Sequence, residues 1–363
     1  MILFYTFLKK RYKIYSVAYV FDTYTRSSLD CIMLFFMKKI DLHQDVILSF
    51  VHSVEGFWDE SKVQDIDGTY AGNFTAYLAA ELRVVFAANR PYQVTGDFAD
   101  LAWRKIAYSQ VVFEQQQTAI EQLIHMYELW TILSVQDLLL DKRLSFLLHI
   151  EWVDHKVTLQ DIRDYFARWV RSIGFVRNYD NFLATNNTTR EETWLTTLWR
   201  SIVAEMNTLG MIIDTAHMSH AAMMEVAEIS SKPILNSHAN LKHFCPHPRN
   251  VEDEFLFALQ KNWGVLWLSV YQTFVWWLDV EAYLEQIAYV IDRIGSDHVA
   301  LGTDFHWLPT KKCLEGVQHI TDLSALEIAI TKRFWVPLAQ KFFRTNAQRI
   351  LQQNLPTEMP ICL

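Results

Sequence analysis

The chain has 363 residues, a formal net charge of −8 and a pI near 5.9, and this acidic balance argues against a nucleic-acid-binding surface. Apolar residues make up 51% of the chain and charged residues 20%, which excludes an intrinsically disordered protein. No apolar run reaches the roughly 18 residues that a membrane span needs. These features favour a globular protein whose partners are small molecules, without nucleic acid and without a membrane span.

The cysteines bear on the redox compartment. Cys31, Cys245, Cys313 and Cys362 lie far apart and include no CxxC pair. This spacing fits neither a disulfide framework nor a thiolate zinc site. We therefore expect a reducing compartment and a cytoplasmic location.

Residues 1–36 differ from the rest of the chain. Short apolar stretches come first and basic residues between positions 9 and 13 follow, which is the wrong order for a secretory signal peptide. We interpret 1–36 as an N-terminal appendage, and one hypothesis is that Met37 is the true start. No Pro/Gly-rich linker or repeat divides the remainder, so we expect one domain over 37–363.

Along that domain, short apolar runs alternate with longer segments of helical spacing. The runs are KKIDLHQD, RLSFLLHIEW, LGMIIDTAH, KPILNSH, WGVLWLSVY and HVALGTDF, and they are typical of buried parallel strands. The helical segments span 117–139, 159–173, 197–209, 219–230, 251–262, 280–294 and 324–343. This alternation predicts an α/β protein, and the strand ends rich in polar residues favour a (β/α)8 TIM-type barrel.

The carboxyl ends of barrel strands meet on one face, where active sites form. His43 and Asp45 end the first run and share a face if the strand alternates regularly. His217 and His238 end two later runs, one βα unit apart. Imidazole and carboxylate groups suit zinc, although manganese, cobalt or iron could use the same set. Each residue alone could be an ordinary polar strand end; together they favour a metal site.

Two acidic residues follow other runs. Glu151 comes after LSFLLHI, and its two carboxylate oxygens could bridge two metal ions; the alternative is a surface glutamate that starts a loop. Asp304 comes after VALGT. A carboxylate there could accept a proton from a metal-bound hydroxide and deliver it to a leaving amine, or it could be a turn aspartate.

Six ordered blocks, IDLHQD, HIEW, LGMIIDTAHMS, KPILNSHANL, HPRNVEDE and DHVALGTDF, resemble the membrane (renal) dipeptidase family of zinc metallopeptidases in the amidohydrolase superfamily. The resemblance runs from about residue 40 to RTNAQRIL near residue 351. It implies a TIM-type barrel, two zinc ions per chain, a hydroxide between the ions that attacks the peptide carbonyl, and a dipeptide-like substrate. It also suggests a homodimer.

The resemblance implies a role for each residue that matches a family motif. The metal ligands would be, in chain order, His43, Asp45, Glu151, His217 and His238. The first two would bind one ion, the two later histidines the other, and the glutamate would bridge both. Asp304 would be the catalytic proton shuttle.

Three further residues would bind the substrate. Arg249, in HPRN, matches the residue that grips the substrate's C-terminal carboxylate, a task suited to a planar bidentate donor. Tyr271, in WLSVY, matches a tyrosine near the same carboxylate, with a core tyrosine as the alternative. Arg177, in FVR, replaces a family histidine or tyrosine, and its charge favours a substrate with a second anionic group.

Tryptophan stands where the family usually has glycine in four places. These are Trp152 after Glu151, Trp199 in the turn that begins at Leu195, Trp263 before Gly264, and Trp307 after Asp304. Glycine at such places permits close backbone approach or a positive φ. Trp152 and Trp307 flank proposed site residues, so the pocket would be smaller or differently shaped; alternatively, the indoles cover the barrel rim.

The sequence thus predicts a zinc-dependent hydrolase of the membrane dipeptidase type. One alternative is an amidohydrolase that acts on N-acyl amino acids or lactones, to which the departures at Arg177, Trp152 and Trp307 point. Another is a metal-retaining binding protein with little catalysis. The presence of Asp304 argues against the second alternative, because a pure binder has no use for a proton shuttle.

Overall fold

The structure is a computed structural model that describes residues 38–44, 76–77, 80–89, 92–95, 105–108, 110–140, 144–153, 156–177, 184–187, 195–276, 279–305 and 310–359. Within 38–108, the side chains of residues 42–43, 92–95 and 105–108 are not described. Contacts group Lys38–Leu363 into one compact unit, apart from Met1–Met37. The expectations for residues 1–36 and for a start at Met37 lie outside the described residues.

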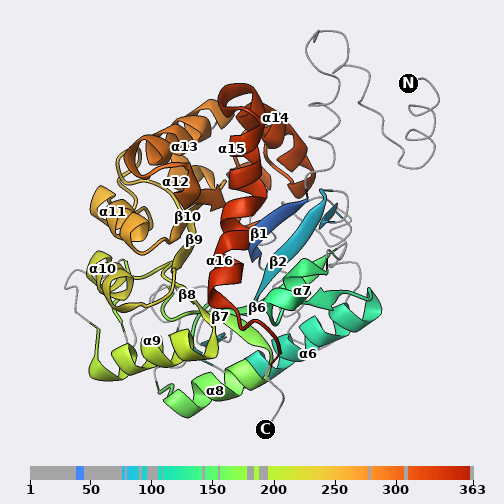
Figure 1. Ribbon diagram of the computed structural model, residues 1–363, viewed down its shortest axis with the longest axis vertical. Helices are drawn as coiled ribbons and strands as arrows, with labels where there is room; N and C mark the ends of the chain where they lie inside the picture. The colour runs from blue at the N-terminus through green and yellow to red at the C-terminus, as the bar shows by residue number, and fades with distance from the viewer. Residues whose placement is uncertain are drawn as a thin grey trace. The chain divides into compact units, whose positions relative to one another are not determined.

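Eight parallel strands form a nearly closed barrel, which confirms the predicted TIM-type fold (Figure 1). In sheet order they are β1 (Lys39–Gln44), β2 (Leu82–Asn89), β6 (Ser145–Ile150), β7 (Val170–Gly174), β8 (Ile212–Asp214), β9 (Leu235–Ala239), β10 (Val265–Leu268) and β11 (Val299–Leu301). The six predicted apolar runs all contribute a strand. Additional short strands are β5 (Trp130–Thr131), which pairs with the start of β6, and the antiparallel pair β3 (Tyr92–Thr95) and β4 (Lys105–Tyr108).

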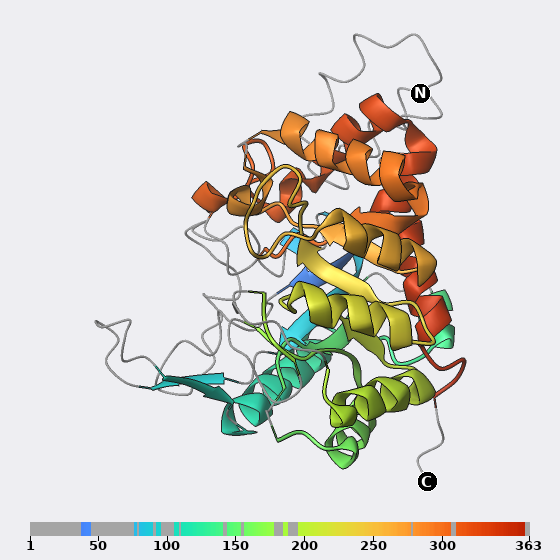
Figure 2. The ribbon, with the colours of Figure 1, turned by 90° about the vertical axis from the view of Figure 1, so that its left-hand side faces the viewer.

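Helices lie around the strands in both views (Figures 1 and 2). They are α6 (Gln110–Met126), α7 (Val135–Leu139), α8 (Leu159–Ala167), α9 (Thr197–Leu209), α10 (His220–Ile229), α11 (Asp253–Lys261), α12 (Gln272–Val275), α13 (Val280–Ile294), α14 (Leu323–Phe334), α15 (Val336–Gln340) and α16 (Asn346–Asn354). The predicted 197–209 and 280–294 agree with α9 and α13 at both ends. Side-chain caps fix their starts, since Thr196 and Asp279 each accept a hydrogen bond from the first turn.

Three predicted helices were too long. The segments 117–139, 159–173 and 324–343 are each interrupted, after Met126, Ala167 and Phe334 respectively. Just beyond each break, one residue has a left-handed backbone, namely Glu128 (φ 50°), Trp169 (φ 72°) and Trp335 (φ 73°). A left-handed residue ends a helix, and glycine is its usual sequence signal. Glycine is absent from these three positions, so the breaks were invisible in the sequence.

The helix α16 closes the amino-terminal end of the barrel. It crosses the strands in Figure 1, and Ala347, Ile350 and Leu351 pack in one buried cluster with residues from the first halves of the strands. Those strand residues include Ile40, Val84, Ile212, Leu235 and Val265. With this end filled by apolar side chains, the opposite end, where the strands finish, is left for polar chemistry.

Side-chain hydrogen bonds join the first and last strands of the ladder. The buried carboxylate of Asp41 on β1 accepts the backbone N–H of Thr303 at 3.1 Å and its hydroxyl at 2.6 Å. The amide of Gln44 donates to the same carboxylate at 2.5 Å. Thr303 directly precedes Asp304, so these bonds hold the proposed proton shuttle against the end of β1.

Replacement of the Asp41 carboxylate by an amide tests how much these hydrogen bonds stabilise the barrel. Three groups donate to Asp41: the Thr303 N–H, the Thr303 hydroxyl and the Gln44 amide. In Asp41→Asn, one of these donors faces an N–H group instead of an oxygen, and we expect the free energy of unfolding to fall by about 2–3 kcal/mol. Urea titration of the metal-free protein measures it. Thr303→Ser, which keeps the hydroxyl and loses a methyl group, should cost about 1 kcal/mol; an equal loss in both variants would contradict this account.

Candidate metal centre

Three electron-pair donors converge at the carboxyl ends of three strands. Glu151 directly follows β6, His217 lies in the loop after β8, and His238 lies near the end of β9. The Nε2 atom of His217 is 3.0 Å from Nε2 of His238 and 3.1 Å from Oε1 of Glu151. The third distance, from Nε2 of His238 to Oε1 of Glu151, is 3.7 Å. All three side chains are buried.

These distances match one metal ion. Two ligand atoms bound tetrahedrally to zinc, each about 2.1 Å from it, lie roughly 3.4 Å apart. The three donors therefore surround a position of the right size for a divalent cation, and they have the ligand types that zinc prefers. The residues present fit the metal that the sequence predicts at this place.

The hydrogen bonds of His238 set its tautomer. The hydroxyl of Ser237 lies 2.5 Å from Oδ2 of Asp214 and 2.7 Å from Nδ1 of His238. Because a carboxylate only accepts, the single hydroxyl proton goes to Asp214, and the hydroxyl oxygen accepts the proton on Nδ1 of His238. The Nε2 lone pair of His238 is then directed at the cluster, which is the form of histidine that binds a metal.

The same carboxylate extends the network to the neighbouring strands. Asp214 also accepts the backbone N–H of Ser237 at 3.0 Å and lies 3.5 Å from Nε2 of His149. Nδ1 of His149 is 3.0 Å from the hydroxyl of Ser172. These supporting residues were not predicted from the sequence. For Asp214, Ser237 and His149, the only signal was a polar residue inside or at the end of an apolar run, in GMIID, ILNSH and FLLHI; Ser172 lies in the segment 159–173, which was predicted as a helix.

His217 is held by its loop in a left-handed backbone, with φ 68°. Its carbonyl accepts the N–H of Asn187 at 2.9 Å, and the N–H of Ser219 donates to Thr185 at 2.8 Å. Such strain persists where surrounding bonds fix it, and it is common at functional sites. Burial, together with the nearby charge of Arg249, lowers the pKa of His217 to about 3, so its imidazole is neutral near pH 7 and able to bind a metal.

Two arginines lie beside the donors. Nε of Arg177 is 3.3 Å from Oε2 of Glu151, and the guanidinium of Arg249 donates to the carbonyl of His238 at 3.0 Å. Burial lowers the pKa of Arg249 to about 10, against the raising effect of Asp304 and other nearby carboxylates. Arg249 is therefore charged at neutral pH, close enough to the donors to hold an anionic group of a substrate beside them.

Tyr271 is linked to Arg249 through the ring of Phe274. The Arg249 guanidinium lies over the ring of Phe274, 5.6 Å from its centroid. The rings of Tyr271 and Phe274 meet edge to face with centroids 4.8 Å apart. The structure thus brings Tyr271, Phe274 and Arg249 into one contiguous patch, of which the sequence had predicted the first and the last.

Asp304 follows β11 in a left-handed backbone with φ 60°, and its side chain is buried. Its position depends on Gly302, where an added Cβ would lie 2.0 Å from the carbonyl oxygen of Ser237. Only glycine permits this close approach of β11 to β9. The end of β11 is thereby drawn against the strand that carries His238, and the Asp304 charge acts on Arg249.

The two remaining predicted ligands are not placed. Asp45 lies outside the described residues, as does the side chain of His43, whose backbone belongs to β1. The pairing of β1 with β2 shifts register between Asp41 and Gln44. That His43 and Asp45 share a face and bind a metal therefore stays a prediction.

Another group of possible ligands lies near the surface. His220, Glu252 and Glu254 have donor atoms within 4.8 Å of one another and are partly or fully exposed. Nζ of Lys242 is 2.5 Å from Oε1 of Glu252, so a lysine already balances this charge.

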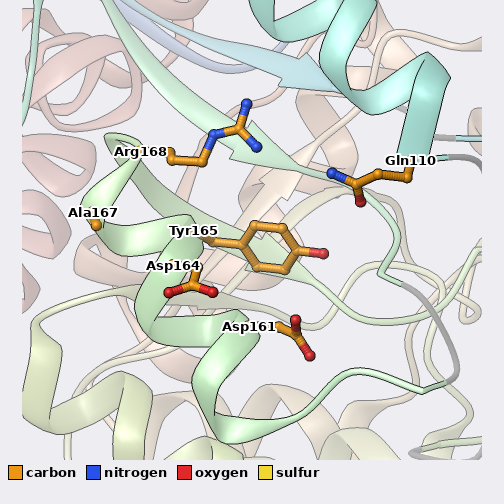
Figure 3. Close-up of a pocket in the computed structure, with 6 residues that line it drawn as sticks. All are labelled: Gln110, Asp161, Asp164, Tyr165, Ala167 and Arg168. Atoms are coloured by element: carbon orange, nitrogen blue, oxygen red, sulfur yellow. The ribbon is translucent and has the colours of Figure 1, made fainter.

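A surface hollow beside α8 is drawn in Figure 3. It is lined by Gln110, Asp161, Asp164, Tyr165, Ala167 and Arg168. Asp161 accepts the N–H of Thr158 at 2.7 Å as a helix cap, and Arg168 donates to Glu114 at 2.8 Å. Asp161 therefore caps α8 and Arg168 joins α8 to α6. The hollow is separate from the three donors.

Within the described residues, the structure contains no helix that is both long and apolar enough to cross a membrane.

The Ser237 hydroxyl offers a test of the His238 geometry. In Ser237→Ala the Nδ1 proton of His238 loses its acceptor, and we expect zinc affinity to fall about 10–100-fold while the fold is kept. Competition with a chelator measures the affinity. Ser172→Ala is the matched control, because its hydroxyl contacts His149 and no predicted ligand; equal affinity in both variants would refute the proposed orientation.

Comparisons with known proteins show the family to which the chain belongs. The sequence model of the family described as Membrane dipeptidase (Peptidase family M19) matches residues 37–359. The dipeptidase aclJ of Aspergillus oryzae is 34% identical over 191 residues, which span 50% of this chain and 45% of that protein. The dipeptidase tcpJ of Claviceps purpurea is 31% identical over 163 residues, or 42% and 37% of the two chains. The chain thus matches less than half the length of these relatives.

Solved structures share the fold. A metallopeptidase from Rhodobacter sphaeroides, bound to a phosphinate mimic of the dipeptide L-Ala-D-Ala, has a TM-score of 0.76 and 19% identity, covering 88% of this chain and 99% of that chain. The probable dipeptidase PvdM from Pseudomonas aeruginosa has a TM-score of 0.73 and 14% identity, covering 89% and 97%. The family match over residues 37–359 shows that this chain belongs to the membrane dipeptidase family, Peptidase family M19.

Proposed function

We propose that this protein is a metal-dependent dipeptidase that hydrolyses the amide bond of a dipeptide or of a similar small amide with a free carboxylate. The observation that carries the proposal is the cluster of Glu151, His217 and His238, with the charged Arg249 3.0 Å from the His238 carbonyl. Membership of the membrane dipeptidase family supports it. The dipeptide mimic bound to the Rhodobacter sphaeroides protein makes L-Ala-D-Ala a rational first substrate.

The finer proposal concerns the metals. Two zinc ions would be held, one by His217 and His238 and one by His43 and Asp45, with Glu151 between them, and a hydroxide that bridges the ions would be the nucleophile. Zinc supplies a Lewis acid for the amide carbonyl and lowers the pKa of bound water. The neutral imidazoles and the carboxylate described above are the ligand forms this requires.

The residues of the chain divide the remaining work. Arg249 binds the carboxylate at the substrate's C-terminus and so places the adjacent amide bond over the three donors. Asp304 accepts a proton from the attacking water and delivers it to the leaving amine, which balances the hydrolysis. Arg177, paired with Glu151 at 3.3 Å, adds a positive charge that favours a substrate with a second anionic group. The predicted homodimer and cytoplasmic location remain part of this proposal.

A substrate panel tests the activity. We expect the purified protein with zinc to hydrolyse dipeptides, including those with a D-residue at the C-terminal position, and a chelator to abolish turnover. Release of free amino acid measures it. Faster turnover of N-acyl amino acids or lactones would instead support the alternative amidohydrolase activity, and no zinc-dependent turnover of any dipeptide would remove the dipeptidase assignment.

Asp304→Asn tests the proton shuttle separately from metal binding. Asparagine has nearly the same shape but cannot take a proton, so kcat should fall about 10²–10⁴-fold. Zinc content, measured in the same preparation, should be unchanged, because Asp304 is not a proposed ligand. An unchanged kcat would rule out the shuttle, whereas loss of zinc with activity would make Asp304 a ligand instead.

A further inference from the structure

Tryptophan occupies a backbone position made for glycine at the end of α11. The N–H of Trp263 donates to the carbonyl of Gln260 at 3.1 Å, and the N–H of Gly264 donates to that of Leu259 at 2.8 Å. This pair of bonds is the Schellman motif, whose left-handed residue is usually glycine. Trp263 is that residue, with φ 60°. At the end of α9 the equivalent left-handed residue is Gly210, with φ 81°.

Trp335, which follows α14, has a still more restrictive backbone. Its φ is 73° and its ψ is 162°, a combination that is essentially confined to glycine. Gly295, which follows α13, has φ 92° and ψ 160°. Two helices of the same barrel therefore end in nearly the same conformation, one with glycine and the other with tryptophan.

Burial stabilises the indoles at these positions only weakly, because much of each side chain is exposed. Besides the two above, Trp169 has φ 72° and Trp276 has φ 76°. The exposed fractions of the four residues are 42% for Trp169, 60% for Trp263, 60% for Trp276 and 76% for Trp335. A bulky residue with positive φ is an outlier that needs compensation, and a side chain so exposed contributes little burial to provide it.

A buried tryptophan shows the opposite problem, a lack of space. The rings of Trp199 and Phe175 cross at 79° with their centroids 3.7 Å apart, closer than the 4.5–7 Å usual for aromatic pairs. Among the described residues, the buried Nε1 atoms of Trp199 and Trp267 have no hydrogen-bond partner. An indole N–H normally finds a partner when it is buried. The site at 199 is too small and too apolar for the residue it holds.

The composition shows the same exchange. Glycine usually makes up about 7% of a globular chain, and ten glycines among 363 residues are fewer than half of that share. The chain has 13 tryptophans, and the two residue types together number 23, close to the share that glycine alone usually has. Against that usual share the chain lacks about 15 glycines, a number close to the 13 tryptophans that it contains.

We propose that these tryptophan positions are glycine positions, and that the protein made in its source organism carries glycine there. The structure assigns 169, 199, 263, 276 and 335 to this set by backbone or space, and the family's glycine motifs add 152 and 307. One codon explains the exchange: UGA is read as tryptophan in some genetic codes and as glycine in others. If a gene in which UGA encodes glycine is translated with a code in which UGA encodes tryptophan, the resulting protein sequence has tryptophan at each UGA codon.

The consequence for function lies beside the metal centre. Position 152 directly follows the donor Glu151, and Trp152 is 7% exposed, with its indole enclosed in the protein. With glycine there, the buried volume that the indole fills is empty of side chain. The narrowing of the pocket that the sequence predicts from Trp152 and Trp307 then does not apply to the natural protein. This inference does not depend on the dipeptidase proposal.

Sequencing of the natural protein tests the proposal directly. Peptides that cover 169, 263, 276 and 335, prepared from the source organism and analysed by mass spectrometry, should carry glycine, and the gene should have UGA at each of these codons. Peptides with tryptophan at these positions, or UGG codons in the gene, would overturn it.

A recombinant comparison tests the physical basis. A variant with glycine at the four positive-φ positions should melt at a higher temperature than the tryptophan form and than a variant with alanine at all four, because alanine also disfavours a positive φ. Phe257, a 48% exposed residue within α11, provides the matched control: Phe257→Gly should lower the melting temperature. If the glycine variant is no more stable than the alanine variant, the backbone does not require glycine, and the proposal fails.

Discussion

Three possible metal-binding atoms, Oε1 of Glu151 and Nε2 of His217 and His238, are held within 3.7 Å of one another in a buried position. Such donors repel unless a cation or proton lies between them. Burial keeps His217 neutral near pH 7, and a metal ion between the three atoms would satisfy all of them. The convergence of these three side chains is therefore the constraint on which the surrounding structure depends.

The rest of the barrel serves that constraint. The closed amino-terminal end confines polar chemistry to the other end, and the bonds of Asp41 with Thr303 hold the last strand against the first. Asp214 fixes the tautomer of His238 through Ser237. Arg249 packs on the backbone of the same histidine, so the group that would bind the substrate's carboxylate is positioned by the ligand itself. The proposed metal site and the proposed substrate site would thus share one scaffold.

The sequence predicted the barrel and the three donors from the same feature, apolar runs that end in histidine or carboxylate. The runs form the strands, and the carboxyl ends of barrel strands meet on one face, which brings their last polar residues together. It could not predict the support from Asp214 and Ser237, whose roles depend on contacts across strands. The helix ends at 169 and 335 were missed because tryptophan stood where a left-handed residue was needed. Had glycine been there, the usual signal of a helix end would have marked the start of β7 and the break after α14.

The position of the metal ion is the most direct test of the central claim. Anomalous X-ray diffraction from zinc-loaded crystals should show one ion about 2.0–2.2 Å from the donor atoms of Glu151, His217 and His238, and a second ion on the other side of the Glu151 carboxylate. An anomalous map with no zinc among these three side chains, from crystals in which zinc is bound elsewhere, would contradict the account.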